Sequence, residues 1–423
     1  MFDLSTHACT VMRALTSLPE NPPGFDLGLA RAVLGVDDSA GLAVLGELVQ
    51  HGIADEHQDG QYKLADTTMF TRDGGSANAA AVEAAITWFV QQAVHADHVR
   101  DRHGSKLSSA YEILVQSRFN TPADAMFWFE PHHNWFVALL DDLVARKRYE
   151  LSLTLAEAVF GLAGHGGHQR DQLHAAKTAL QALGRLRFSP EWIAGLGEDP
   201  DRARLHDLRV ARFNLQLAFV LSNLHGPIDA LKALDAAEER GRALGDAGVL
   251  AAVHRGRGRT HHAAGDLNKA ERELRKALEL DLASGDKRRI YLCRRDLGAV
   301  LADLERHEEA GAELHLAAVG TNELGDRIPH ARVLTVAGAA FITAGEPVKA
   351  IAPLTLALDT MKQEEAGSDA YLADIYVSLA RARRATNDPT AADHCFRKAV
   401  EHYRLAHRDR AAADVEAEWH QQQ

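Results

Sequence analysis

The sequence predicts an all-α protein in which a small N-terminal module with one β-hairpin precedes a superhelix of stacked helical hairpins. Three observations lead to this prediction. Residues 206–415 carry a pattern that repeats about every 40 residues, residues 5–52 contain three apolar-faced helical segments, and an Asp-Gly pair then separates two short runs led by apolar residues. A chain of 423 residues is long enough for two or three domains with cores of their own.

The N-terminal module is expected to span residues 1–70. A first helix over residues 5–17 should end before Pro19, and Asp26 is expected to cap a second helix by accepting a backbone hydrogen bond. A third helix should stop at Gly52. Its core face is expected to carry Leu42, Leu45, Leu48 and Val49.

The β-hairpin is expected in the stretch GIADEHQDGQYKLAD, residues 52–66. Asp59-Gly60 lies between its two apolar-led runs, and glycine supplies the positive φ that a tight turn requires. Three helices followed by a hairpin form the outline of a winged helix, and many winged helices bind DNA.

The charges of this module argue against DNA binding. Residues 1–70 contain ten acidic side chains and three basic ones, Arg13, Arg31 and Lys63, and the third helix has neither lysine nor arginine. Because affinity for DNA comes largely from neutralising phosphates, such a surface would repel it. A module kept for packing or for docking a protein is the preferred interpretation, and a DNA-contacting transcriptional regulator is the alternative.

Residues 77–205 are expected to be helical but less regular. We predict a linker near residues 70–78, a helical connector over 77–126 and irregular helical hairpins over 127–205, one of which turns near Lys147. The stretch 189–201, which is rich in proline, glycine and acids, is expected to be a loop before the repeats.

The repeat of residues 206–415 has about five copies. Gly258, Gly265, Ala270, Leu274 and Ala277 recur as small or apolar residues 40 positions apart, except that Glu305 replaces the second glycine. A glycine in the first helix lets the second helix come close, while leucine and alanine place apolar bulk on the inner face. One helix pair cannot bury its apolar faces alone, so the pairs stack. This pattern resembles the tetratricopeptide repeat.

A tetratricopeptide stack exposes its first helices on a concave groove, at positions 2, 5, 9 and 12 when Gly258 is position 8. Seven arginines and one histidine fall at these positions in a protein of net charge −12. The candidate binding residues are Arg212, Arg255, Arg259, His262, Arg295, Arg332, Arg381 and Arg384. Guanidinium groups bind carboxylates through two parallel hydrogen bonds, which predicts a groove for an acidic peptide segment or a terminal carboxylate.

This groove is similar in kind to the carboxylate clamp of some tetratricopeptide domains, although the asparagines of that clamp are absent here. In the alternative interpretation, the arginines pair with acids of neighbouring helices such as Glu271 and Glu273, and the groove binds nothing. The sequence leaves both open.

The whole chain also resembles the C-terminal half of actinobacterial STAND regulators with an NB-ARC-type ATPase. After the winged helix, Trp88, Phe89 and Asp97 match an aromatic pair and an acid of that family, and Trp128 with Asn134 matches the next motif. The resemblance implies a sensor and scaffold half. The P-loop pattern Gly-x-x-x-x-Gly-Lys-Ser/Thr is absent, so the ATP-driven switch cannot be carried over, and a separate regulator or ATPase is expected as a possible partner.

Composition narrows the remaining function classes. The acidic balance and 6% aromatic content argue against a dedicated nucleic-acid binder. With three dispersed cysteines, no secretory signal and no apolar run of 18 residues, we expect a cytoplasmic protein that does not enter membranes. No spacing indicates a catalytic triad or a metal site, so we expect no cofactor, no metal and no catalysis. An enzyme with a site between connector and repeats is the weakest hypothesis.

Overall fold

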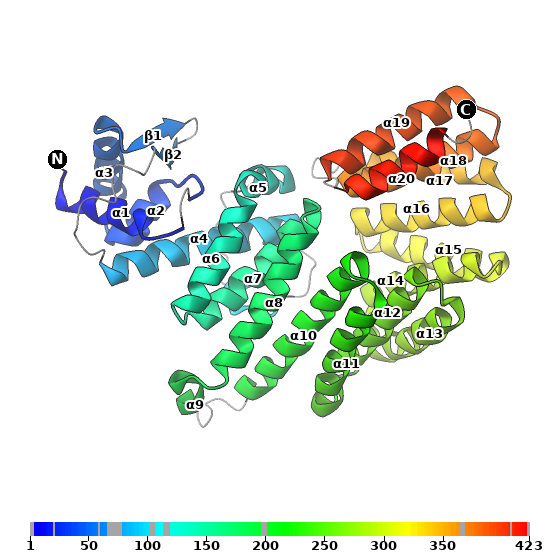
Figure 1. Ribbon diagram of the computed structural model, residues 1–423, viewed down its shortest axis with the longest axis horizontal. Coiled ribbons are helices and arrows are strands. Elements are labelled where there is room, and N and C mark those ends of the chain that lie inside the picture. The colour runs from blue at the N-terminus through cyan, green and yellow to red at the C-terminus, as the bar shows by residue number, and fades with distance from the viewer. Residues whose placement is uncertain are drawn as a thin grey trace. The chain divides into compact units, whose positions relative to one another are not determined.

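Helices make up most of the computed structural model, which describes residues 4–19, 22–57, 60–65, 78–101, 106–112, 119–195, 201–363, 369–406 and 408–420. The chain forms two compact units (Figure 1). The first comprises residues 1–162 and 181–188, and the second comprises residues 163–180 and 189–423. Among the described residues, no helix is both long and apolar enough to cross a membrane.

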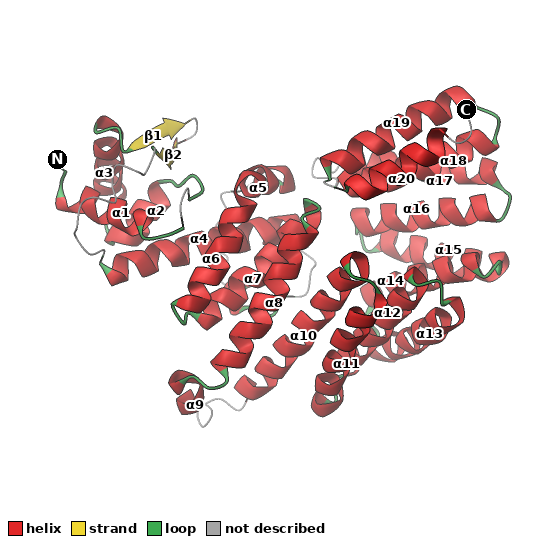
Figure 2. Cartoon of the chain, viewed as in Figure 1, coloured by secondary structure: helices red, strands yellow, loops and turns green. Residues whose placement is uncertain are grey.

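Three helices and a hairpin begin the first unit, as the sequence predicts. The helices are α1 (Thr6–Thr16), α2 (Leu27–Leu34) and α3 (Asp38–Gln50). Strand β1 (Ala54–His57) then pairs antiparallel with β2 (Gln61–Leu64), and these are the strands drawn in yellow in Figure 2. The tip of the predicted turn, including Asp59, lies outside the described residues.

Local chemistry explains where these elements begin and end. The Asp26 side chain accepts a hydrogen bond from the Gly28 N–H at 2.7 Å, which confirms the predicted cap. Gly52 has φ of +67° directly after α3. Ahead of α2, Phe25 exchanges two backbone hydrogen bonds with Tyr62 of β2, at 2.9 and 2.8 Å, which ties the hairpin to the helices.

The predicted core face of α3 is wrong at Leu42, which is 52% exposed. Gly41 lies against Leu27 of α2, where a Cβ atom would come within 2.6 Å of the leucine Cδ1. This close approach sets the buried stripe one residue earlier, so that Val44 is buried and Leu42 points away. The exposed positions of α3 include Leu42, Ala43, Gly46 and Gln50, none of which is basic.

The helices that follow bury aromatic side chains. They are α4 (Ala79–Arg100), the short η3 (Ser109–Tyr111), α5 (Pro122–Phe129), η4 (Glu130–His132) and α6 (His133–Ala145). The ring centres of Phe89 and Trp135 lie 4.9 Å apart, and those of Trp128 and Phe136 lie 5.1 Å apart. Lys147, with φ of +62°, turns the chain after α6 as predicted. The predicted linker at 70–78 lies outside the described residues, apart from Asn78.

The second unit is a succession of paired helices that stack in chain order in Figure 1. Helices α7 (Tyr149–His165) and α8 (Gln169–Leu186) contribute residues to both units. The remaining helices are α9 (Pro190–Gly195), α10 (Asp201–Leu224), α11 (Pro227–Leu244), α12 (Ala247–Ala263), α13 (Leu267–Ser284), α14 (Lys287–Asp303), α15 (His307–Glu323), α16 (Arg327–Thr343), α17 (Pro347–Gln363), α18 (Asp369–Ala385), α19 (Pro389–Leu405) and α20 (Asp409–His420).

Helix α9 corrects the expectation of a loop over residues 189–201. Ser189 accepts a hydrogen bond from the Trp192 N–H at 3.1 Å, and Pro190 occupies the first helical position. Proline fits that position because its missing N–H would have no helical partner there. The Ser-Pro pair therefore starts a short helix within a stretch whose composition resembles a loop.

Each repeat of about 40 residues corresponds to one closely packed helix pair, as the sequence predicts. A Cβ atom on Gly258 would lie 2.5 Å from Leu274 Cγ, and one on Gly298 would lie 2.6 Å from Leu314 Cγ. Each glycine thus lets the second helix of its own pair approach closely. The turns within the pairs also share their geometry, because Gly265 and Glu305 have φ of +80° and +61° respectively. Glu305 adopts the left-handed conformation that glycine provides in the neighbouring copy.

Candidate functional site: an arginine-lined groove

The predicted binding residues lie on the first helices of successive pairs. Arg212 lies on α10, Arg255, Arg259 and His262 on α12, Arg295 on α14, Arg332 on α16, and Arg381 and Arg384 on α18. Four of these arginines, on α12, α14 and α16, line two adjoining pockets. We call the two pockets together the arginine groove, and its arginines are Arg255, Arg259, Arg295 and Arg332.

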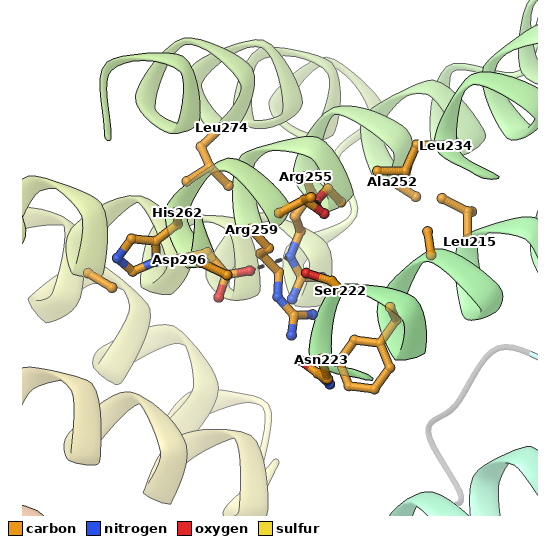
Figure 3. A pocket seen from close by; sticks show the side chains of 16 residues that line it. Leu215, Ser222, Asn223, Leu234, Ala252, Arg255, Arg259, His262, Leu274 and Asp296 are labelled. Carbon is orange, nitrogen blue, oxygen red and sulfur yellow. Dashed lines mark hydrogen bonds and ion pairs between the residues drawn. The ribbon is translucent and has the colours of Figure 1, made fainter. Parts of the chain in front are cut away.

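The first pocket has a volume of about 470 Å³ and lies over α10 and α12 (Figure 3). One part of its wall is apolar, with Leu215 and Phe219 from α10 and Leu234 from α11. Arg255 and Arg259 project from α12 into the same space. The pocket therefore has an apolar side and a charged side.

The second pocket has a volume of about 220 Å³, and Val336, Met361 and Ile375 form an apolar part of its lining. Arg259, Arg295 and Arg332 line it together with Tyr371 and Asp374 of α18. Arg259 and Asp296 contribute to both pockets, so the two spaces meet at these side chains. Along both pockets, four arginines face two aspartates.

Asp296 is the main acceptor within the arginine groove. Its carboxylate accepts hydrogen bonds from Arg255 Nε at 2.8 Å and from Arg295 Nε and Nη2 at 2.9 and 2.5 Å. Burial would raise the pKa of Asp296, but the charges of Arg295, Arg255 and Arg259 hold it far below its usual range. One ionised carboxylate is thereby shared among several guanidinium groups.

Arg295 is the most buried of the four, with 4% of its surface exposed. Burial lowers the pKa of Arg295 to about 10, and although Asp296 opposes this shift, Arg332, Arg255 and Arg259 add to it. Its Nη1 atom is buried and has no hydrogen-bond acceptor among the described residues. A buried donor without an acceptor costs about 1–3 kcal/mol, which the other contacts of Arg295 must offset.

Arg259 and Arg332 are held by aromatic rings. The Arg259 guanidinium lies 4.9 Å from the centre of the Phe219 ring, and that of Arg332 lies 4.6 Å from the Tyr371 ring. Within the described part of the chain, neither forms an ion pair with a carboxylate. Burial lowers the pKa of Arg259, and the nearby charges of Arg255 and Arg332 lower it further against the opposing effect of Asp296. Positive charge is thus in excess at this point.

The other predicted residues lie elsewhere or have partners. Arg381 and Arg384 both bind Glu418 of α20, at 2.6 and 3.1 Å. His262 lines the first pocket and contacts Asp303 at 2.6 Å. Arg212 is half-buried on α10 and does not line either pocket. The arginine groove is therefore shorter than the row of arginines in the sequence.

Sequence reasoning also considered Glu271 and Glu273 as partners of the groove arginines. Glu271 instead binds Arg275 and Arg306, and Glu273 binds His254 and Lys276. Asp296 is a groove residue that the repeat pattern did not predict. Its signal is its place directly after Arg295, where an adjacent acid can reach across the same face of the helix.

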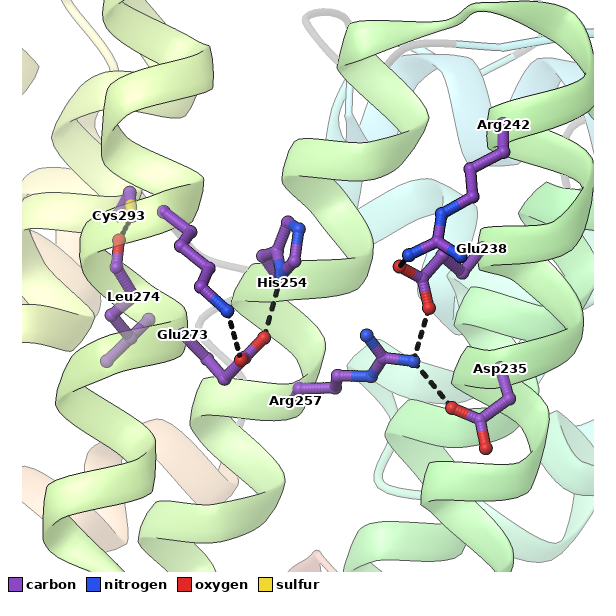
Figure 4. Close-up of polar contacts among 9 residues, drawn as sticks. Asp235, Glu238, Arg242, His254, Arg257, Glu273, Leu274 and Cys293 are labelled. Carbon is purple, nitrogen blue, oxygen red and sulfur yellow. Dashed lines mark hydrogen bonds and ion pairs between the residues drawn. The ribbon is translucent and has the colours of Figure 1, made fainter.

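Two arginines that lie next to groove arginines on the same helices are paired with acids of other helices. On α12, Arg257 binds Asp235 at 2.5 Å and Glu238 at 2.6 Å, both on the neighbouring α11 (Figure 4). On α14, Arg294 binds Glu313 of α15 at 2.6 Å. These pairs join adjacent helices, which gives them a structural role.

In a buried charged cluster of the first unit, the charged groups are also paired with one another. Asp97 of α4 is fully buried and accepts hydrogen bonds from Arg100 Nη2 and Tyr111 Oη, both at 2.8 Å, and from Lys106. Burial would raise the pKa of Asp97, but the charges of Arg100 and Lys106 lower it. Because this carboxylate has enough donors within the chain, the cluster has the properties of a structural anchor.

Comparison with known proteins assigns the repeats to a class. Residues 256–284 and 373–401 match the tetratricopeptide repeat family. The chain therefore carries tetratricopeptide repeats, whose stacked helix pairs form extended concave binding surfaces. The comparison with curated protein sequences gave no match.

Solved structures with a similar course of the chain include a Rap protein complexed with competence and sporulation factor. It has 12% sequence identity and a TM-score of 0.48, and the alignment covers 95% of this chain and 99% of that one. A signal transduction ATPase with numerous domains and a tetratricopeptide repeat sensor, from Pyrococcus horikoshii, has 14% identity and a TM-score of 0.40. That alignment covers 97% of this chain and 66% of the other.

Proposed function

We propose that this protein is a non-enzymatic scaffold or sensor in a regulatory pathway, which binds an acidic protein or peptide segment in the arginine groove. The observation that carries this proposal is the excess of guanidinium groups. Four arginines face two aspartates there, and Arg259 and Arg332 rest on rings without an ion pair to any described carboxylate. The partner is a protein or peptide of acidic character, and a separate regulator or ATPase is one candidate.

Charge balance elsewhere in the repeats supports this interpretation. Three of the groove arginines belong to the same helices, α12 and α14, as Arg257 and Arg294, which are paired with acids of the neighbouring helices. On these two helices, the arginines outside the groove therefore have carboxylate partners, whereas Arg259 has none among the described residues. A ligand carboxylate would supply the missing acceptors.

The chemistry of arginine favours binding over catalysis. Guanidinium groups stay protonated at neutral pH and make rigid forks of N–H donors, which suit recognition of carboxylates but poorly suit proton transfer. The N-terminal module has no comparable excess of positive charge, because the exposed positions Leu42, Ala43, Gly46 and Gln50 of α3 carry no basic side chain. We therefore place the working surface of the protein in the repeats.

A displayed library of random dodecapeptides tests the proposal. The full chain should enrich acidic peptides, and the double variant Arg259→Glu/Arg332→Glu should bind them at least tenfold more weakly. Arg272→Glu is the matched control, because Arg272 is an exposed arginine of α13 that does not line either pocket. Enriched peptides that bind the double variant as well as the natural protein, or no enrichment at all, would contradict the proposed function.

A further inference from the structure

The two pockets of the arginine groove meet at two side chains, Arg259 and Asp296. The first offers an apolar wall with Leu215, Phe219 and Leu234, and the second presents Arg295 and the edge of Arg259. Both residues line the two pockets, so a ligand that reaches one pocket from the other must pass the Arg259 guanidinium and the Asp296 carboxylate. This arrangement requires a ligand with two neighbouring groups of different character.

Resting on the proposed function, we propose that the arginine groove recognises a single carboxylate directly next to an apolar side chain. The carboxylate binds among Arg259, Arg295 and Arg332, and the apolar side chain enters the first pocket against Leu215 and Phe219. The anionic group can be an internal Asp or Glu or the carboxyl terminus of a peptide, since both present the same two oxygens.

The buried guanidinium of Arg295 supports the position of the carboxylate. It is 96% buried, it lines the second pocket, and its Nη1 atom has no acceptor among the described residues. Its other two nitrogens are already bound to Asp296. Because Nη1 is itself enclosed by the protein, Arg295 acts on a ligand in the second pocket through its positive charge and not through this donor.

Arg259 and Arg332, which lie against aromatic rings, supply the hydrogen-bond donors for the ligand carboxylate. The guanidinium carbon of Arg259 lies 4.9 Å from the centre of the Phe219 ring, and that of Arg332 lies 4.6 Å from the centre of the Tyr371 ring. A guanidinium held against a ring in this way keeps N–H donors that can meet a carboxylate. The rings fix the direction of both guanidinium groups before a ligand arrives, which reduces the entropy lost on binding.

The aspartates of the groove favour a monoanion over a dianion. Asp296 is bound to the Arg295 guanidinium and lines the second pocket, and Asp374 lines the same pocket. A phosphate dianion would face both of these carboxyl groups at short range, whereas a carboxylate brings half that charge. The site is thus matched to a carboxylate, and inorganic phosphate is expected to compete poorly.

The apolar wall supports the neighbouring side chain. Phe219 is 39% exposed even though it lies under Arg259, and Leu215 is only half-buried. An apolar side chain that covers them removes water from the wall, at about 25 cal/mol for each Å² of apolar surface buried. It also shields the carboxylate beside it from solvent, which strengthens the ion pairs.

Defined peptides test this inference. Acetylated octapeptides of glycine and serine would carry one leucine beside either an internal glutamate or a free carboxyl terminus, and their binding to the full chain would be measured by calorimetry. Matched peptides replace glutamate by glutamine, the carboxyl terminus by an amide, or leucine by serine. We expect each uncharged peptide to bind at least tenfold more weakly than its carboxylate counterpart, and the serine peptides to bind more weakly than the leucine peptides.

Two variants locate the effect. In Arg295→Met and in Arg332→Gln, the ratio of the affinity for a carboxylate peptide to that for its uncharged counterpart should fall to about one. The leucine peptides should still bind more tightly than the serine peptides. Arg272→Met, an exposed arginine of α13, should keep both preferences. Arg332→Gln keeps the test decisive if the buried substitution prevents folding, because Arg332 is partly exposed.

Each outcome separates this inference from the proposed function. Equal binding of charged and uncharged peptides, or a carboxylate preference that survives in both variants, would overturn the inference. If the displayed library still yields ligands that depend on the arginine groove, the proposed function stands without it. If no peptide of either set depends on the groove, both are wrong. Stronger binding of phosphate than of the carboxylate peptides would also contradict the monoanion site.

Discussion

Arg257 and Arg259 lie two residues apart on α12, yet they have opposite electrostatic surroundings. Arg257 points to α11 and binds Asp235 and Glu238, and these bonds raise its pKa despite partial burial. Arg259 points into the arginine groove, where burial and neighbouring arginines lower its pKa. The same difference separates Arg294, paired with Glu313, from the adjacent Arg295.

This difference shows which face of a repeat is structural and which is available for binding. Charges between adjacent helices are matched within the chain, so they hold the helix pairs together. Charges on the arginine groove depend on Asp296, which serves both Arg255 and Arg295. Mutations on the two faces should therefore change stability in different ways.

The largest expected effect is that of Asp296→Asn. Removing this carboxylate leaves Arg255 and Arg295 without the acceptor they bind, and breaking a buried ion pair from one side costs about 3–5 kcal/mol. The free energy of unfolding, measured by urea denaturation with circular dichroism, should fall by this amount.

Asp303→Asn is the control for this variant. Asp303 contacts His262, but its carboxylate is 47% exposed, so its loss should change the free energy of unfolding by less than about 0.5 kcal/mol. If the two variants were equally stable, Asp296 would not be the acceptor on which the groove depends.

A smaller effect is expected where the helices that carry the arginines meet their partners. In Gly298→Ala the added Cβ would lie 2.6 Å from Leu314 Cγ, so the variant should lose about 1–3 kcal/mol of unfolding free energy. Gly311→Ala in the same helix pair meets nothing within 4 Å and should gain about 0.5–1 kcal/mol, because alanine favours helix. Thermal unfolding midpoints would compare the two. A Gly298→Ala protein as stable as Gly311→Ala would show that the glycine does not set the helix spacing.

Most of the packing within the repeats could be predicted from the sequence. Gly258 and Gly298 recur at the positions where Leu274 and Leu314 approach, since close helix packing leaves room only for glycine. A periodic pattern reports such contacts because every copy must satisfy them. The same reasoning missed helix α9, whose Ser-Pro start is a local signal inside a loop-like composition.

The arginine groove could be predicted only in part from the sequence. The repeat register placed Arg255, Arg259, Arg295 and Arg332 on one surface, and the structure places all four around two pockets. The repeat register does not predict the contacts of α20, whose Glu418 binds Arg381 and Arg384. Whether an arginine is paired depends on the reach of side chains from other helices, and periodicity within one helix carries no information about that.

The most direct test of the central claim compares Arg257→Met with Arg259→Met at low ionic strength, where ion pairs contribute most. Methionine keeps much of the apolar stem of arginine, so the difference reports mainly on the charge. The free energy of unfolding should fall by about 1 kcal/mol in Arg257→Met, because Asp235 loses its partner and Glu238 keeps only Arg242. It should stay the same or rise in Arg259→Met, since that charge has no carboxylate partner among the described residues. A loss in Arg259→Met as large as that in Arg257→Met would contradict the account.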